Sequence, residues 1–134
     1  MSKKYQLLEN DTIEEDGQTL YRIQALRDIP DVVKRGELGG YVTSESNLSH
    51  EGDCWVGGNA QIRGEAEVSD NAQVSGKALV FGNARVFGSA HVFGNAGIRD
   101  NARVFGYARI SDYAQVYGNA WVSGHARIYD FAQV

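Results

Sequence analysis

Three histidines and one cysteine are the side chains of this chain that could act as a general base, a nucleophile or a metal ligand. His50, His91 and His125 lie far apart, and none belongs to a Ser/His/Asp arrangement with a recognisable spacing. Cys54 is the only cysteine, which excludes an intrachain disulfide and a cysteine metal cluster. No phosphate-binding loop is present. The sequence therefore predicts no catalytic residue, no metal and no cofactor, and it favours a protein that is not an enzyme.

Arginine and aromatic residues are the second group that could do chemistry, and they become frequent after Leu79. Arginine beside aromatic rings is typical of protein interfaces, and it also suits anionic ligands with flat rings, such as nucleotides. The alternative is that these side chains only cover a sheet and stabilise it by stacking and cation–π contacts. The residues expected to form a ligand site or an interface are Arg85, Phe87, Arg103, Phe105, Tyr117, Trp121, Tyr129 and Phe131.

A six-residue repeat must position these side chains. When the sequence is divided into hexads that begin at Cys54, the first position holds alanine from Ala60 to Ala132, and the third position always holds Val or Ile. Two residues further on the chain holds Gly or Asp, often followed by Asn. Residues two apart point to the same face of a strand, and Gly, Asp and Asn tolerate the positive φ of a corner. Each hexad is therefore expected to be a short strand followed by a turn.

Strands this short can bury apolar surface only by stacking. We expect a solenoid in which successive hexads form parallel strands around a narrow interior of Ala and Val/Ile. Glycine or aspartate at every sixth position excludes a coiled coil, and a period of six excludes a pentapeptide-repeat helix. The sequence alone thus predicts an all-β fold.

The motif V-x-G-N-A-x resembles the hexapeptide repeat of left-handed parallel β-helices, in which an aliphatic residue is followed four residues later by a small one, as in Val86 and Ala90. The resemblance covers Cys54 to Val134 and implies a left-handed triangular prism in which three hexads make one coil. Many members of that family place glycine directly after the aliphatic residue, whereas here it comes one residue later. The segments "LYRIQALRDI", "GELGGYV" and "NLSHEGDCWV" are similar to a narrower group of bacterial and phage proteins, some labelled acyltransferases.

Acyl transfer is the activity that this resemblance implies. Enzymes of the family use a histidine general base, often beside a loop that bulges from a coil. This chain has no insertion between Cys54 and Val134, and a general base needs a pocket that excludes water.

With three hexads per coil, the outward residues form columns. Tyr113 and Phe131 are expected to stack at one corner. Each hexad contributes two outward residues, and three successive coils give three such pairs on each face. The first face carries Arg85 and Phe87, Arg103 and Phe105, and Trp121 and Ser123; the second carries Leu79 and Phe81, Gly97 and Arg99, and Gln115 and Tyr117. The third carries His91 and Phe93, Arg109 and Ser111, and Arg127 and Tyr129.

The first 41 residues do not repeat. They are expected to form an antiparallel hairpin or three-stranded meander, with its turn at Asp16–Gly17, that caps a β-helix of residues 42–134. The glycines of the segment 35–41 are expected to allow a sharp entry into the prism. In a degraded repeat before Cys54, Leu48 takes the alanine position and His50 the Val position, so His50 is expected to be a hydrogen-bonded plug.

Charge and hydropathy restrict the class of protein. The formal net charge is −4, with 13 basic and 17 acidic residues, which argues against a strongly basic nucleic-acid binder. The N-terminal segment has no hydrophobic run, so we expect neither a signal peptide nor a membrane span. The expected location is the cytoplasm of a bacterium or of a phage-infected cell.

The hexad "YDFAQV" ends the sequence without a capping segment. An uncapped coil exposes unpaired strand edges and apolar side chains, so the sequence indicates either a truncated chain or an end that another subunit covers. We therefore expect a non-catalytic β-helical structural or binding module that forms a homo-oligomer through its C-terminal coils or an aromatic/Arg face. Two alternatives stay open: a phage protein that binds an anionic, nucleotide-like small molecule in grooves between subunits, and an acyltransferase. A host protein is a further possible partner.

Overall fold

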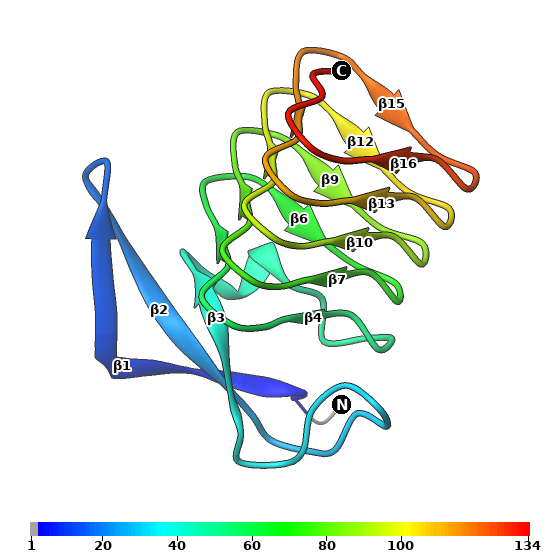
Figure 1. Cartoon of the computed structure of the whole chain (residues 1–134). Helices are drawn as coiled ribbons and strands as arrows, with labels where there is room; N and C mark the ends of the chain where they lie inside the picture. Colours follow the sequence, from blue (N-terminus) through cyan, green and yellow to red (C-terminus); the bar gives the residue numbers. More distant parts are fainter. Residues whose placement is uncertain (1–2) are drawn as a thin grey trace.

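The computed structural model describes residues 3–134, which form an N-terminal hairpin joined to a β-solenoid (Figure 1). The hairpin consists of β1 (Tyr5–Glu15) and β2 (Gln18–Ala25), and β3 (Leu38–Val42) pairs antiparallel with β2. A 3-10 turn, η1 (Glu45–Asn47), is the only helical segment of the described residues. The strands that follow are β4 (Trp55–Val56), β5 (Gln61–Ile62), β6 (Glu67–Val68), β7 (Gln73–Val74), β8 (Leu79–Val80), β9 (Arg85–Val86), β10 (His91–Val92), β11 (Gly97–Ile98), β12 (Arg103–Val104), β13 (Arg109–Ile110), β14 (Gln115–Val116), β15 (Trp121–Val122) and β16 (Arg127–Ile128).

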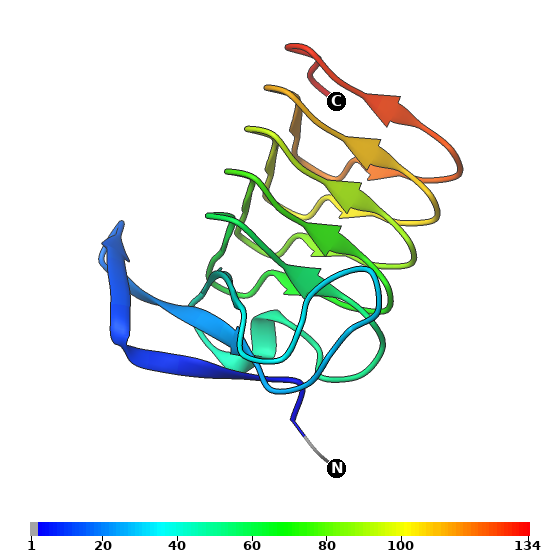
Figure 2. The ribbon, with the colours of Figure 1, turned by 60° about the horizontal axis from the view of Figure 1, so that its bottom comes forward.

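Three parallel sheets form the sides of the solenoid. Their strand orders are β3-β5-β8-β11-β14, β4-β7-β10-β13-β16 and β6-β9-β12-β15, and the first is extended by the antiparallel β2 and β1. Each strand from β4 to β13 pairs with the strand three hexads later, so Val86 lies beside Val104 and Val104 beside Val122. Figure 2 shows the coils stacked in sequence order, with the hairpin at the end opposite the C-terminus. The predicted β-solenoid is confirmed, and its left hand stays a prediction.

The interior contains the small and β-branched residues that the repeat assigned to it. Ala102 and Val104 are fully buried, whereas their neighbours Arg103 and Phe105 lie outside and are half-buried. The inward residues of every coil from Cys54 to Val116 are likewise buried. The outward residues are more exposed, except for Trp55 and Gly97, which are also buried. In the last coil Ala126 and Ile128 are partly buried and Val134 is exposed. The predicted frame of the repeat is therefore correct.

The geometry of the corners explains why the fifth position of each hexad, counted from Cys54, is either Gly or Asp. Residues at this position have φ between 56° and 70° from Gly52 to Asp130. In this region a side chain is strained unless it gains a local hydrogen bond. Asp70 and Asp100 gain one, because their carboxylates accept hydrogen bonds from the backbone N–H of Gly88 and Gly118 in the next coil, at 3.0 and 2.9 Å. Asp112 accepts from the N–H of Asp130 in the same way.

This geometry predicts that Gly106→Asp is better tolerated than Gly106→Ala. A Cβ on Gly106 would lie 2.8 Å from the backbone nitrogen of Gly124, so either substitution forces a small shift. Only aspartate can then accept a hydrogen bond from that nitrogen, as Asp70 does from Gly88. We expect the alanine variant to be less stable by about 1 kcal/mol, the net worth of such a bond, in denaturant unfolding. Equal stability of the two variants would contradict this account of the corners.

The first coil differs from the prediction by two residues. Leu48 pairs with Val68 rather than with Ala66, so it occupies the Val position of the repeat and not the Ala position. Gly52 nevertheless packs against Asp70, the equivalent corner residue of the next coil. The stretch between Leu48 and Gly52 thus contains two extra residues, which turn His50 toward the head. His50 is hydrogen-bonded as predicted, but the inward position assigned to it was wrong.

The head packs onto this first coil through Tyr5. The Tyr5 ring stacks on His50 at 4.2 Å, and its hydroxyl donates to the carbonyl of Glu45 at 3.0 Å. Gly39 and Gly40 lie within β3 instead of in a loop, and a Cβ on either would lie 2.5 Å from the carbonyl oxygen of Val56 or Ala60. These two glycines are therefore required by close backbone approach and not by a sharp turn.

Candidate binding faces of the C-terminal coils

The face of β9, β12 and β15 carries an aromatic ladder. Phe87 and Phe105 stack with ring centroids 4.9 Å apart, and Trp121 meets Phe105 edge-on at 5.9 Å. Arg103 lies 5.7 Å from the Trp121 ring, in cation–π contact. Stacking leaves Phe87 and Phe105 only half-exposed, whereas 68% of Trp121 remains exposed. The exposed aromatic surface of this face is therefore concentrated at its C-terminal end.

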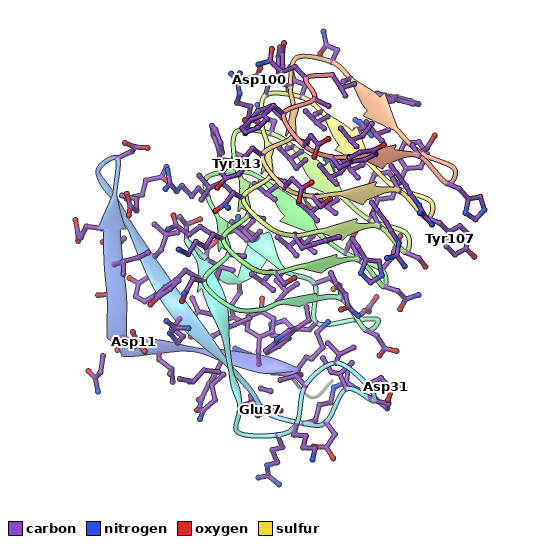
Figure 3. All side chains as sticks on the ribbon, viewed as in Figure 1. Asp11, Asp31, Glu37, Asp100, Tyr107 and Tyr113 are labelled. Atoms are coloured by element: carbon purple, nitrogen blue, oxygen red, sulfur yellow. The ribbon has the colours of Figure 1, made fainter. Side chains whose placement is uncertain are left out.

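Two corners carry further stacked pairs. Tyr113 stacks on Phe131 at 5.1 Å, as the column arrangement predicted, and Tyr107 stacks on His125 at 5.0 Å. Figure 3 shows that Tyr107 and Tyr113 project from two different corners of the solenoid. Phe131 is 75% exposed. Each of these rings thus stacks on a partner one coil away.

The face of β11 and β14 exposes less aromatic surface than the ladder face. Tyr117 is half-buried, and the Arg99 guanidinium lies 4.7 Å above its ring. On the neighbouring ladder face, Arg85 pairs with Glu67 at 3.7 Å, with both side chains about half-exposed. Such an exposed pair contributes at most about 1 kcal/mol. The eight residues predicted for a site are thus divided among several faces and corners instead of forming one cluster.

The face of β10, β13 and β16 carries a column of two arginines and one histidine, here called the cation column, which the sequence analysis aligned but did not select for a site. His91, Arg109 and Arg127 lie side by side on successive coils. Within residues 3–134, no carboxylate lies within 4.0 Å of the Arg109 or Arg127 guanidinium. Burial lowers the pKa of His91, and the neighbouring Arg109 lowers it further. The excess of basic over acidic residues in the later coils was the signal that could have selected this column as a site.

Two hollows flank this cation column. One, of about 420 Å³, is lined by the column and by Ser89, Tyr107 and His125. The other, of about 460 Å³, is lined by Phe93, Arg109, Ser111, Asp112, Arg127 and Tyr129. Arg109 and Arg127 line both hollows and can therefore reach an anion bound in either.

The remaining histidine and the cysteine have structural contacts. His50 Nδ1 accepts a hydrogen bond from the Lys4 backbone N–H at 3.1 Å, and its Nε2 lies 2.8 Å from Glu45. Cys54 is fully buried, and burial raises the pKa of its thiol. Residues 3–134 contain no group of three His, Cys, Asp or Glu side chains arranged to hold a metal ion. No described helix has the length and apolar character needed to cross a membrane.

A family model matches two segments of the chain. The YdcK beta solenoid repeat matches residues 78–94 and 114–130. Over these two segments the chain is similar to YdcK solenoid repeats. The matched segments include Arg85, Phe87 and His91 in the first and Trp121 and Arg127 in the second, so they span parts of the faces described above. No curated protein matches the chain significantly.

Proposed function

We propose that the chain is a non-catalytic β-solenoid binding module, bacterial or phage-encoded, that associates with copies of itself through its C-terminal coils. The observation that carries the proposal is the concentration of exposed aromatic rings there. In the head, by contrast, Tyr5 and the first-coil Trp55 beside it are buried. The C-terminal rings that are more than half-exposed are Tyr107, Tyr113, Trp121, Tyr129 and Phe131.

Exposed aromatic surface of this kind favours association for two physical reasons. Aromatic residues are enriched in the buried centres of protein interfaces, and large exposed apolar patches are uncommon on monomers. The stacked pairs Tyr113–Phe131 and Tyr107–His125 are also ordered by their coil neighbours. Because they are ordered before binding, little conformational entropy is lost when a second copy packs against them.

Sedimentation velocity tests this proposal. We expect the wild type to sediment as an oligomer at tens of micromolar. A Phe105→Glu/Trp121→Glu double variant or a separate Phe131→Glu variant should shift it toward monomer, since a charge in an apolar contact is costly.

Leu38→Glu is the matched control. Leu38 is an exposed apolar residue of the head, 52% accessible, and it lies outside the proposed contact. The control should therefore sediment like the wild type. A monomeric wild type at these concentrations would overturn the proposal.

Binding of an anionic small molecule is a second candidate function. The column of His91, Arg109 and Arg127 favours this function, because no carboxylate of the described residues forms an ion pair with these side chains. Residues 71–134 carry six Arg or Lys and three Asp, whereas residues 1–70 carry seven basic and fourteen acidic residues. The net charge of −4 thus conceals a positive C-terminal half. The sequence led us to expect such a site in grooves between subunits, and this second candidate uses a column of basic residues on one face of a chain.

A further inference from the structure

The cation face contains a gap in an aromatic column. Phe93, Ser111 and Tyr129 occupy equivalent positions on successive coils, each two residues after a member of the cation column. The small Ser111 side chain therefore lies between two aromatic residues. Phe93 is 37% exposed and Tyr129 is 56% exposed. Neither ring stacks on another ring among residues 3–134.

The width of this gap suits one flat ring. Where aromatic residues lie on adjacent coils at equivalent positions and stack face to face, their ring centroids are 4.9 to 5.1 Å apart. Phe93 and Tyr129 are two coils apart, which corresponds to about 9.6 Å at the strand spacing of a sheet. A ring placed midway would lie about 4.8 Å from each, a favourable distance for offset stacking. The hollow of about 460 Å³ lies at this position.

The charges around the gap define what else the ligand must carry. Arg109 and Arg127 line the hollow, and His91 continues their column on the preceding coil. Asp112 also lines the hollow, and its Oδ2 accepts a hydrogen bond from the N–H of Asp130. A carboxylate there would repel an anion but could accept a hydrogen bond from an N–H group of a ring. The ligand should therefore be a flat ring with N–H donors that is linked to an anionic group.

We propose that Phe93, Ser111 and Tyr129 form a slot for the base of a nucleoside phosphate, whose phosphates contact Arg109, Arg127 and His91. Bidentate guanidinium contacts suit phosphate oxygens, and stacking between two aromatic rings suits any base. This inference names the ligand class for the second candidate function and rests on it. Of the residues in the slot and the cation column, only Tyr129 was among those that the sequence predicted for a site.

Calorimetric titration with ATP, pyrophosphate and adenosine tests the slot. ATP should bind at least about tenfold more tightly than either fragment, because it uses the ring and anion contacts together. Ser111→Phe fills the gap with a built-in ring, so it should weaken ATP binding about tenfold or more, within the range of base stacking. It should leave pyrophosphate binding unchanged and should not lower the melting temperature. Ser123→Phe, which extends the Phe87–Phe105 column on another face, is the matched control and should bind ATP like the wild type.

Two further variants separate the parts of the site. Tyr129→Ala removes one wall of the slot and should weaken ATP binding but not pyrophosphate binding, even if the phenylalanine variant folds poorly. Arg109→Gln should weaken both ligands. The slot would be contradicted if ATP binding were unaffected by Ser111→Phe and Tyr129→Ala, or were no tighter than pyrophosphate binding. Either result would still be consistent with anion binding on this face. Failure of both ATP and pyrophosphate to bind at millimolar concentration would overturn both.

Discussion

Replacing Ala102 with leucine should lower the free energy of unfolding by at least about 1–3 kcal/mol, the usual cost of overpacking a core. Ala102 is fully buried in an interior built only of Ala and Val/Ile from Ala60 to Val116. Its neighbours one coil away, Ala84 and Ala120, are also alanines. The additional carbons of leucine therefore have no space unless the coils separate. Denaturant unfolding monitored by circular dichroism measures the effect.

Arg103→Leu is the matched control for this experiment. It introduces the same side chain one residue away, on the outer surface, where a substitution is usually worth no more than about 0.5 kcal/mol. The guanidinium of Arg103 makes one cation–π contact with Trp121, so a small loss is expected. Equal midpoints for the two leucine variants would contradict the assignment of inward and outward positions.

Lys4→Ala should lower the free energy of unfolding by about 3 kcal/mol. The Lys4 side chain is fully buried, and its ammonium group donates to the carbonyl oxygens of Cys54 at 2.7 Å and Gly52 at 3.3 Å. Its Nζ also lies 3.2 Å from the Cys54 Sγ. The alanine variant leaves these carbonyls without that donor and opens a cavity between the head and the first coil. Burial lowers the pKa of Lys4, which agrees with this enclosed position.

Lys3→Ala is the control for the loss of a neighbouring lysine. Lys3 pairs with Glu45 at 3.1 Å, and its side chain is 60% exposed. An exposed ion pair contributes at most about 1 kcal/mol, so this variant should be nearly as stable as the wild type. Thermal unfolding of the two variants in parallel gives the comparison. A Lys4→Ala variant as stable as Lys3→Ala would show that the buried contacts do not hold the head.

The repeating part of the fold could be predicted because one physical rule acts in every hexad. A small and a β-branched residue at fixed spacing determine which side faces inward, and the spacing between coils then sets every column. The rule fails before Cys54, where two extra residues between Leu48 and Gly52 shift the frame. The burial of Lys4 could not be predicted either, because its carbonyl partners lie about 50 residues away in the first coil and nothing in the repeat indicates that the head contacts them.

The aromatic columns were predictable for the same reason, and the stacks of Phe87 on Phe105 and of Tyr113 on Phe131 agree with the expected registers. The sequence aligns His91, Arg109 and Arg127 in one column, but charge summed over the whole chain does not identify them as a site. The acidic head hides the excess of arginine in the later coils. Residues three hexads apart lie on the same face, so the charge of one face can be summed from the sequence. This sum identifies His91, Arg109 and Arg127.

Native mass spectrometry of the full chain, purified from cells at tens of micromolar, tests the central claim most directly. One chain has a mass of 14.7 kDa. Self-association through the C-terminal coils predicts species at integer multiples of that mass, which the Phe131→Glu or the Phe105→Glu/Trp121→Glu variant reduces and Leu38→Glu preserves. A single species of 14.7 kDa for the wild type would contradict the account.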